Sequence, residues 1–136
     1  MLSPTIHTLR LFLHILGASV WVGGQIALAG VVPGLRRVSP QATKVAARAF
    51  ARVAWPAFAL VVITGLWNLT KVDVGDTSTT YQITLFVKLL LVFASGAAAA
   101  VHGLGRSKLA LAVGGAIGLL AGLGAMFCGY LLTTGT

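Results

Sequence analysis

Four long runs of apolar residues, separated by short polar or basic segments, dominate the sequence. The runs cover about residues 6–32, 53–69, 81–101 and 109–132. A helix needs about 20 predominantly apolar residues to cross the hydrocarbon core of a bilayer, and each run is close to that length. The pattern therefore predicts an all-α fold, an integral membrane four-helix bundle in which residues 1–136 form a single four-span domain.

Short breaks mark the expected ends of the spans. Pro33-Gly34 ends the first run, and Gly75-Asp76-Thr77 is a turn signal before the third. Residues 35–52 predict a loop and a basic, amphipathic start of a helix in the headgroup region, with the basic side chains Arg36, Arg37, Lys44, Arg48 and Arg52. Pro56 lies near the start of the second run, where we expect a kink.

The composition agrees with a membrane protein and excludes several other classes. Only 9% of the residues are charged, whereas soluble domains carry about 25%. The net charge of +8 comes from basic residues in short loops and not from a basic patch with interleaved aromatics, so we expect the lipid bilayer and not nucleic acid as a partner. A single cysteine excludes an intrachain disulfide. There is no Ser-His-Asp pattern, phosphate loop or carboxylate pair that would indicate a hydrolase or NTPase.

The loops also predict an orientation. Seven of the ten basic residues fall in loops on one side of the expected bundle, namely Arg36, Arg37, Lys44, Arg48, Arg52, Arg106 and Lys108. The positive-inside rule places these loops in the cytoplasm. We therefore expect a multi-pass protein of the cytoplasmic (inner) membrane, with both termini on the non-cytoplasmic side.

Three residues of the first run repeat at a helical spacing. His14 lies seven residues after His7 and seven before Trp21, so the three share nearly one helix face. A histidine at membrane depth needs a partner, a ligand or a water-filled cavity. His14 is therefore a candidate ligand or proton-handling group, the alternative being a structural hydrogen bond to a neighbouring helix. Trp21 is expected to face either the core or a flat ligand.

Lys88 is the second polar residue that we expect at this depth. Both it and His14 lie roughly 10–12 Å below the outer boundary, at 1.5 Å per helical residue. The only acids are Asp73 and Asp76, in a loop, so the charge of Lys88 needs a bound ligand such as a carboxylate unless the lysine is neutral. Arg10, one turn above His14, is expected to snorkel to the headgroups, with contact to a ligand carboxylate as the alternative.

Cys128, near the outer end of the last run, reaches a similar level. Its ordinary interpretation is a small buried hydrophobe, and a metal site with His14 is the functional alternative.

Two further patterns concern helix packing. Arg10-Leu-Phe-Leu-His14 matches Thr84-Leu-Phe-Val-Lys88 and hints at a duplicated two-helix hairpin with a site between its halves. In the last run, small residues at Gly114, Gly118 and Gly122 make a groove for close helix packing. That groove could meet another helix of this chain or a second copy in a homo-oligomer.

The first run resembles the first helix of small bacterial membrane proteins of the HemJ type, through Leu13-His14, Trp21, Gly24 and Pro33. The resemblance continues at Pro56, Gly65, Lys88-Leu89 and His102. The related CopD-like copper-resistance domain is similar at Thr64-Gly65-Leu66, Asn68, Tyr81 and Lys88-Leu89. Where HemJ-type proteins carry an arginine and a tyrosine-histidine pattern after this helix, the chain has Gly34-Leu35-Arg36-Arg37.

The resemblance implies a membrane protein that binds heme b or a porphyrin, with an oxidoreductase of the HemJ type as its enzymatic form. It makes His14 the axial ligand and Lys88 its functional partner. The candidate cofactor-binding residues are then His7, His14, Trp21 and Lys88. The candidate catalytic residues are Lys88 and Arg10, which would pair with the heme propionates.

Two alternatives stay open. One is a CopD-like copper-handling or copper-transport protein with His14 and Cys128 as metal ligands, although the chain supplies few of the thiolate and thioether groups that copper(I) prefers. The other is a structural or assembly subunit without a cofactor, in which these polar residues only fix the packing.

Overall fold

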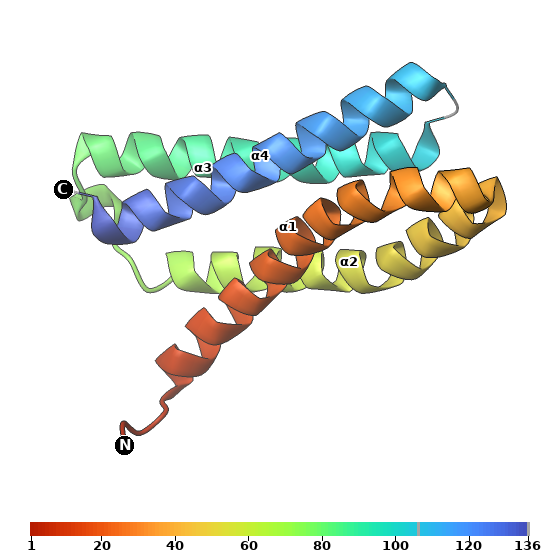
Figure 1. Ribbon diagram of the computed structural model, residues 1–136. Helices are drawn as coiled ribbons and strands as arrows, with labels where there is room; N and C mark the ends of the chain where they lie inside the picture. Colours follow the sequence, from red (N-terminus) through yellow and green to blue (C-terminus); the bar gives the residue numbers. More distant parts are fainter. Residues whose placement is uncertain (106, 136) are drawn as a thin grey trace. The chain divides into compact units, whose positions relative to one another are not determined.

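The computed structural model describes residues 1–105 and 107–135, and it is all-helical over that part of the chain (Figure 1). The four long helices are α1 (Ile6–Val38), α2 (Pro40–Leu69), α3 (Thr79–Leu104) and α4 (Lys108–Thr134). A short 3-10 turn, η1 (Val74–Asp76), lies in the connection between α2 and α3. Each long helix is long and apolar enough to cross a membrane, which confirms the prediction of four helices of spanning length.

The chain forms two compact units, and each is described by itself. Unit one, Met1–Asp73, contains α1 and α2, and unit two, Val74–Thr136, contains η1, α3 and α4. Each unit is an antiparallel hairpin of two long helices (Figure 1). The arrangement of all four helices as one domain stays a prediction.

The connection between α1 and α2 differs from the sequence-based expectation. Pro33-Gly34 does not end α1, which continues to Val38 with Pro33 inside it. Proline removes one N–H from the helix, and membrane helices tolerate that loss. The break comes at Ser39, which is extended (φ −167°, ψ 130°) because the residue before a proline avoids the helical region. Residues 35–52 are therefore the end of α1 and the first three turns of α2.

Hydroxyl side chains cap the starts of the four long helices. Thr5 and Thr8 form a capping box at α1, and Ser39 accepts hydrogen bonds from the first N–H groups of α2. Ser78 and Ser107 play the same part at α3 and α4. Each cap satisfies N–H groups that have no partner within the helix, so these residues fix where the helices begin.

Unit two is packed through small residues. A Cβ atom added at Gly114 of α4 would lie 3.2 Å from the Ala98 carbonyl oxygen of α3. The hydroxyl of Ser95, in α3, donates a hydrogen bond of 2.8 Å to the Gly118 carbonyl oxygen. Gly122 is also buried. Gly114 and Gly118 therefore pack against α3 of the same chain. These two positions are occupied by that contact, so a homo-oligomer would have to form through a different surface.

Candidate functional site

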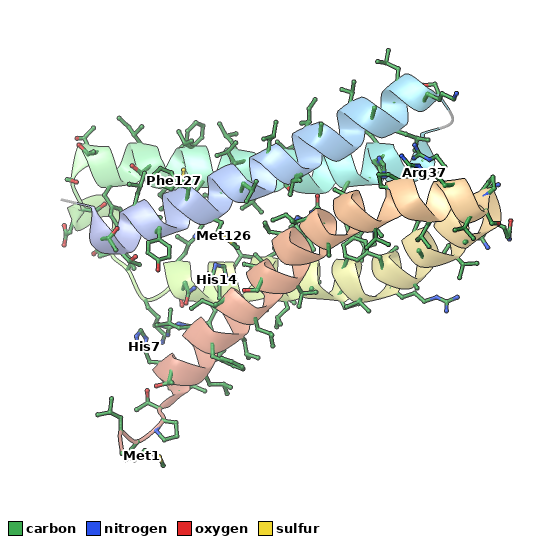
Figure 2. The ribbon with its side chains drawn as sticks, in the orientation of Figure 1. Met1, His7, His14, Arg37, Met126 and Phe127 are labelled. Carbon is green, nitrogen blue, oxygen red and sulfur yellow. The ribbon has the colours of Figure 1, made fainter. Side chains whose placement is uncertain are left out.

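His14 projects from α1 onto α2 within unit one (Figure 2). Its Nδ1 atom lies 2.9 Å from the hydroxyl oxygen of Thr64. A Cβ atom at Gly65 would lie only 3.3 Å from Cε1 of the same ring, so the imidazole rests directly against the backbone of α2. The sequence-based alternative of a hydrogen bond to a neighbouring helix is therefore present, and it fixes the ring.

The second bond of Thr64 determines which nitrogen of His14 carries the proton. The Thr64 hydroxyl lies 2.6 Å from the Leu60 carbonyl oxygen, which can only accept. A hydroxyl has one proton to donate, so towards His14 it must act as acceptor. Nδ1 of His14 then donates to Thr64, and in the neutral imidazole the lone pair lies on Nε2. This is the arrangement in which proteins present a histidine to a metal, with the other ring N–H held by a neighbour.

Arg10 does not extend to the headgroups as we expected from the sequence. Its side chain is only 5% exposed and is held within unit one. Nε donates to the Asn68 side-chain oxygen at 2.7 Å, and the guanidinium lies 5.8 Å from the centre of the Trp67 ring. The reason is that α2 supplies both an acceptor and an aromatic face at this level, which together replace water around the charge.

His7 completes this cluster at the start of α1. An Nη2 hydrogen of Arg10 is donated to Nδ1 of His7 over 2.6 Å, since arginine can only donate. The proton of the His7 ring is then on Nε2, and the nitrogen with the lone pair faces Arg10. Ligation of a metal by His7 would require that bond to break, so the geometry favours His14 over His7 as the ligand.

Trp21 lies in the core of unit one and is 5% exposed. Its ring centre is 4.5 Å from that of Phe58 and 5.3 Å from that of Trp55, both in α2. Of the two sequence-based alternatives for Trp21, the packed core is the one observed. Gln25, one turn further along α1, donates to the Trp21 carbonyl oxygen at 3.1 Å and is a satisfied structural residue.

Lys88 and Cys128 belong to unit two. The Lys88 ammonium lies beside α4, where a Cβ atom at Gly129 would be 3.3 Å from Nζ. Cys128, which directly precedes Gly129 in α4, is buried and close enough to Lys88 for an electrostatic interaction. The expectation that Lys88 and Cys128 share a level is therefore met within this unit. Lys88 is nine residues beyond Thr79, about 13 Å along α3, which separates it from the two acids before the helix.

The remaining candidates divide between the units. His14, His7, Arg10 and Trp21 are in unit one and Lys88 and Cys128 in unit two, so the shared layer of His14 with Lys88 or Cys128 stays a prediction. Nδ1 of His102, in unit two, lies 2.6 Å from the Leu111 carbonyl oxygen, a bond that links α3 to α4. Among the described residues, no group of three or more His, Cys, Asp or Glu side chains is placed to hold a metal ion. Arg106, used for the predicted orientation, lies outside those residues.

Sequence reasoning missed the partners on α2. Thr64 and Asn68 had been noticed only for the resemblance, yet they are the residues that hold His14 and Arg10. A signal was available, because Thr64 is five residues from the end of α2 and His14 eight from the start of α1. In an antiparallel hairpin those positions come to a similar depth.

Comparisons with protein-family models, with curated proteins and with solved structures found no match to this chain.

Proposed function

We propose that this chain is a multi-pass membrane protein that binds heme b, or a related porphyrin, with His14 as the axial ligand. The supporting observation is the bond from His14 Nδ1 to Thr64, whose own proton is committed to the Leu60 carbonyl oxygen. A metal-binding imidazole must be neutral, and a hydrogen bond to its other nitrogen must fix the orientation of the ring. The bond to Thr64 meets the second condition directly.

The donor set fits heme better than a metal ion held by protein side chains alone. One axial histidine is sufficient for heme, because the macrocycle supplies the other four ligands. Bound heme would supply one-electron redox chemistry. The residues of unit one have simpler tasks: Thr64 orients the imidazole, and Gly65 lets the ring lie against α2 without a side chain between them.

The two cations near the expected ligand level form the second part of the proposal. Arg10 is a permanent charge held by the neutral groups of Asn68 and His7. Lys88, in unit two, has no acid within its own helix. We assign both to carboxylates such as the heme propionates, because an ammonium or guanidinium in an apolar span is stabilised by an anion. In an enzyme of this kind they would serve as the catalytic pair.

The proposed location follows from the loops. The basic residues of the connection between α1 and α2 place it in the cytoplasm, with both termini on the outer side of the inner membrane. A reporter enzyme that is active only outside the cytoplasm, fused after residue 135, should therefore be active. An inactive fusion, with an active fusion at the connection between α1 and α2, would reverse the orientation.

The test of heme binding is a spectral titration of the detergent-purified chain with hemin, oxidised and dithionite-reduced. We expect a Soret band with sharpened α and β bands that is lost in His14→Ala and kept in His102→Ala. Thr64→Val keeps the ligand and removes the bond that turns it, so the heme affinity should fall about 10- to 100-fold. Lys88→Met should weaken binding without changing the ligand-dependent band positions.

Two results would overturn the proposal. One is the absence of a Soret band with supplied heme, in which case metal analysis would test the copper alternative through His14 and Cys128. The other is an unchanged spectrum in His14→Ala, which would show that another residue ligates the heme. A folded His14→Ala, Lys88→Ala double variant with no functional change would favour a structural subunit.

A further inference from the structure

The end of unit one opposite to Arg10 carries a dense basic surface. It consists of the exposed side chains of Arg36 and Arg37 in α1 and of Lys44, Arg48 and Arg52 in α2, called here the basic corner. Figure 2 labels Arg37 at this end of α1, far along the helix from His7. We infer that the basic corner binds the phosphate of an anionic phospholipid headgroup, with Arg48 and Arg52 as its centre.

The geometry of α2 gathers three of these charges into one stripe. Lys44, Arg48 and Arg52 follow one another at four-residue spacing, so they lie on one helix face, about 6 Å apart along the axis. A surface hollow on the same face is lined by Val45, Arg48, Ala49 and Arg52. Its two guanidinium groups can donate several hydrogen bonds to a phosphate, while Val45 and Ala49 give it an apolar wall.

The chain supplies no counter-charge for the basic corner. Its only acids are Asp73 and Asp76, which follow the far end of α2. From Arg52 to Leu69 the helix runs 17 residues, about 26 Å, and this exceeds the screening length of about 8 Å at physiological salt. Five clustered cations without an acid nearby need an anion from outside the chain.

The length of α2 puts this anion at a membrane surface. α2 has 30 residues and is about 45 Å long, whereas the hydrocarbon core is about 30 Å thick. Counted back from Leu69, the last 20 residues span that thickness, which leaves the segment before Phe50 outside it. Arg48 then lies just outside the boundary and Arg52 less than one turn inside it, from where a long arginine side chain reaches the lipid phosphates. This argues for a phospholipid over nucleic acid or an acidic protein.

The experiment measures thermal unfolding of the full chain in neutral detergent with added phosphatidylglycerol or phosphatidylcholine. We expect phosphatidylglycerol to raise the midpoint at lower concentration than phosphatidylcholine. An exposed basic residue contributes about fivefold to affinity for an anionic surface, so Arg48→Gln/Arg52→Gln should weaken the phosphatidylglycerol effect about 30-fold. The control Lys71→Gln removes a positive charge beyond the opposite end of α2, away from the basic corner, and should change it less than about fivefold.

Several outcomes would overturn the inference. They are equal stabilisation by the two lipids, an unchanged phosphatidylglycerol effect in the arginine double variant, or an equal loss in the arginine double variant and in Lys71→Gln. Stabilisation by glycerol phosphate alone would show a free phosphate site, and displacement of the lipid by an RNA oligonucleotide would show a nucleic-acid surface. If the arginine variant does not fold, the unchanged chain provides the test. In that case 0.5 M NaCl must weaken the stabilisation by phosphatidylglycerol and leave the stabilisation by phosphatidylcholine unchanged.

Discussion

The two hairpins of this protein have the same topology and hold their helices together by different means. In unit one, α1 and α2 also approach closely at Gly17, but large or polar side chains add directed contacts. These are the bond of His14 to Thr64 and the ring contacts of Trp21 with Trp55 and Phe58. In unit two, α3 and α4 meet through backbone and small residues, such as Gly114 against Ala98. Among its described residues, the buried hydrophobic side chains are Leu85, Ala121, Ala125 and Cys128.

The difference shows two ways in which the helices of a hairpin can be held together: by close backbone packing, or by side-chain contacts that fix individual groups in one orientation. In lipid there is little hydrophobic driving force between helices, so packing and hydrogen bonds must hold them together. Glycine contacts maximise packing and leave side chains out of the interface. Directed polar contacts hold individual groups in one orientation, which is what a ligand-binding histidine requires. We therefore place the candidate cofactor ligand in unit one.

The largest effect that this comparison predicts is at the aromatic core of unit one. Trp21→Ala removes both ring contacts and leaves a cavity, at a cost of about 3 kcal/mol, the low end for soluble cores because lipid replaces water as the alternative environment. Trp55 is 42% exposed and buries a smaller share of its side chain, so Trp55→Ala should cost less than half as much. Denaturation in detergent, followed by circular dichroism, measures both. Equal losses would mean that Trp21 is not the centre of the core.

A smaller loss of stability is expected where a glycine lets two helices come close together, and its size should differ between the two units. A Cβ atom at Gly17 would lie 2.8 Å from a methyl of Val61 and 2.9 Å from the Ala57 carbonyl oxygen, so Gly17→Ala should cost about 1–3 kcal/mol. At Gly114 the nearest atoms are 3.2 Å away, and Gly114→Ala should cost less. Gly23 has open space, and Gly23→Ala should stabilise by up to about 1 kcal/mol. The same denaturation assay ranks the three, and a stabilising Gly17→Ala would contradict the packing.

The last comparison concerns the two buried hydroxyls of Thr64 and Ser95, and the smallest loss is expected at Ser95. Thr64→Val leaves the Nδ1–H of His14 without its acceptor, which costs about 1–3 kcal/mol when the group stays buried. Ser95→Ala removes a donor from the Gly118 carbonyl oxygen, which keeps its helical bond, and should cost about 0.6 kcal/mol. Thermal midpoints of the two variants in one detergent measure the difference. A larger loss for Ser95→Ala would reverse the comparison between the units.

Much of the fold could be predicted because the signals are local. Apolar runs of spanning length require helices, since backbone polar groups in lipid must be satisfied within the segment. The positions of Ser39-Pro40 and of the Ser107 cap fix helix starts through neighbouring residues alone. Pro33 was misread as a helix end because a proline within a membrane helix is tolerated, and the competing break at Ser39 was only six residues away.

The candidate site was predicted in part. That His14 and Lys88 lie within apolar helices follows from the sequence, and so does the absence of an acid among them. The burial of Arg10 could not be predicted from the sequence. Whether this side chain extends to the headgroups or is buried depends on which acceptor and aromatic side chains the neighbouring helix places at the same level. The same holds for Trp21, whose two possible environments depend on Phe58 and Trp55.

By itself, then, the sequence determined the four apolar helices of membrane-spanning length and the polar residues that need a partner, since these depend on hydropathy and spacing along one chain. Only the tertiary structure decided which partners they have. Thr64 determines which ring nitrogen of His14 carries the proton, and Asn68 accepts a hydrogen bond from Arg10. These partners are 50 and 58 positions apart in the sequence, and the antiparallel pairing of α1 and α2 brings them together. Such contacts depend on the register and rotation of two helices, which no local pattern specifies.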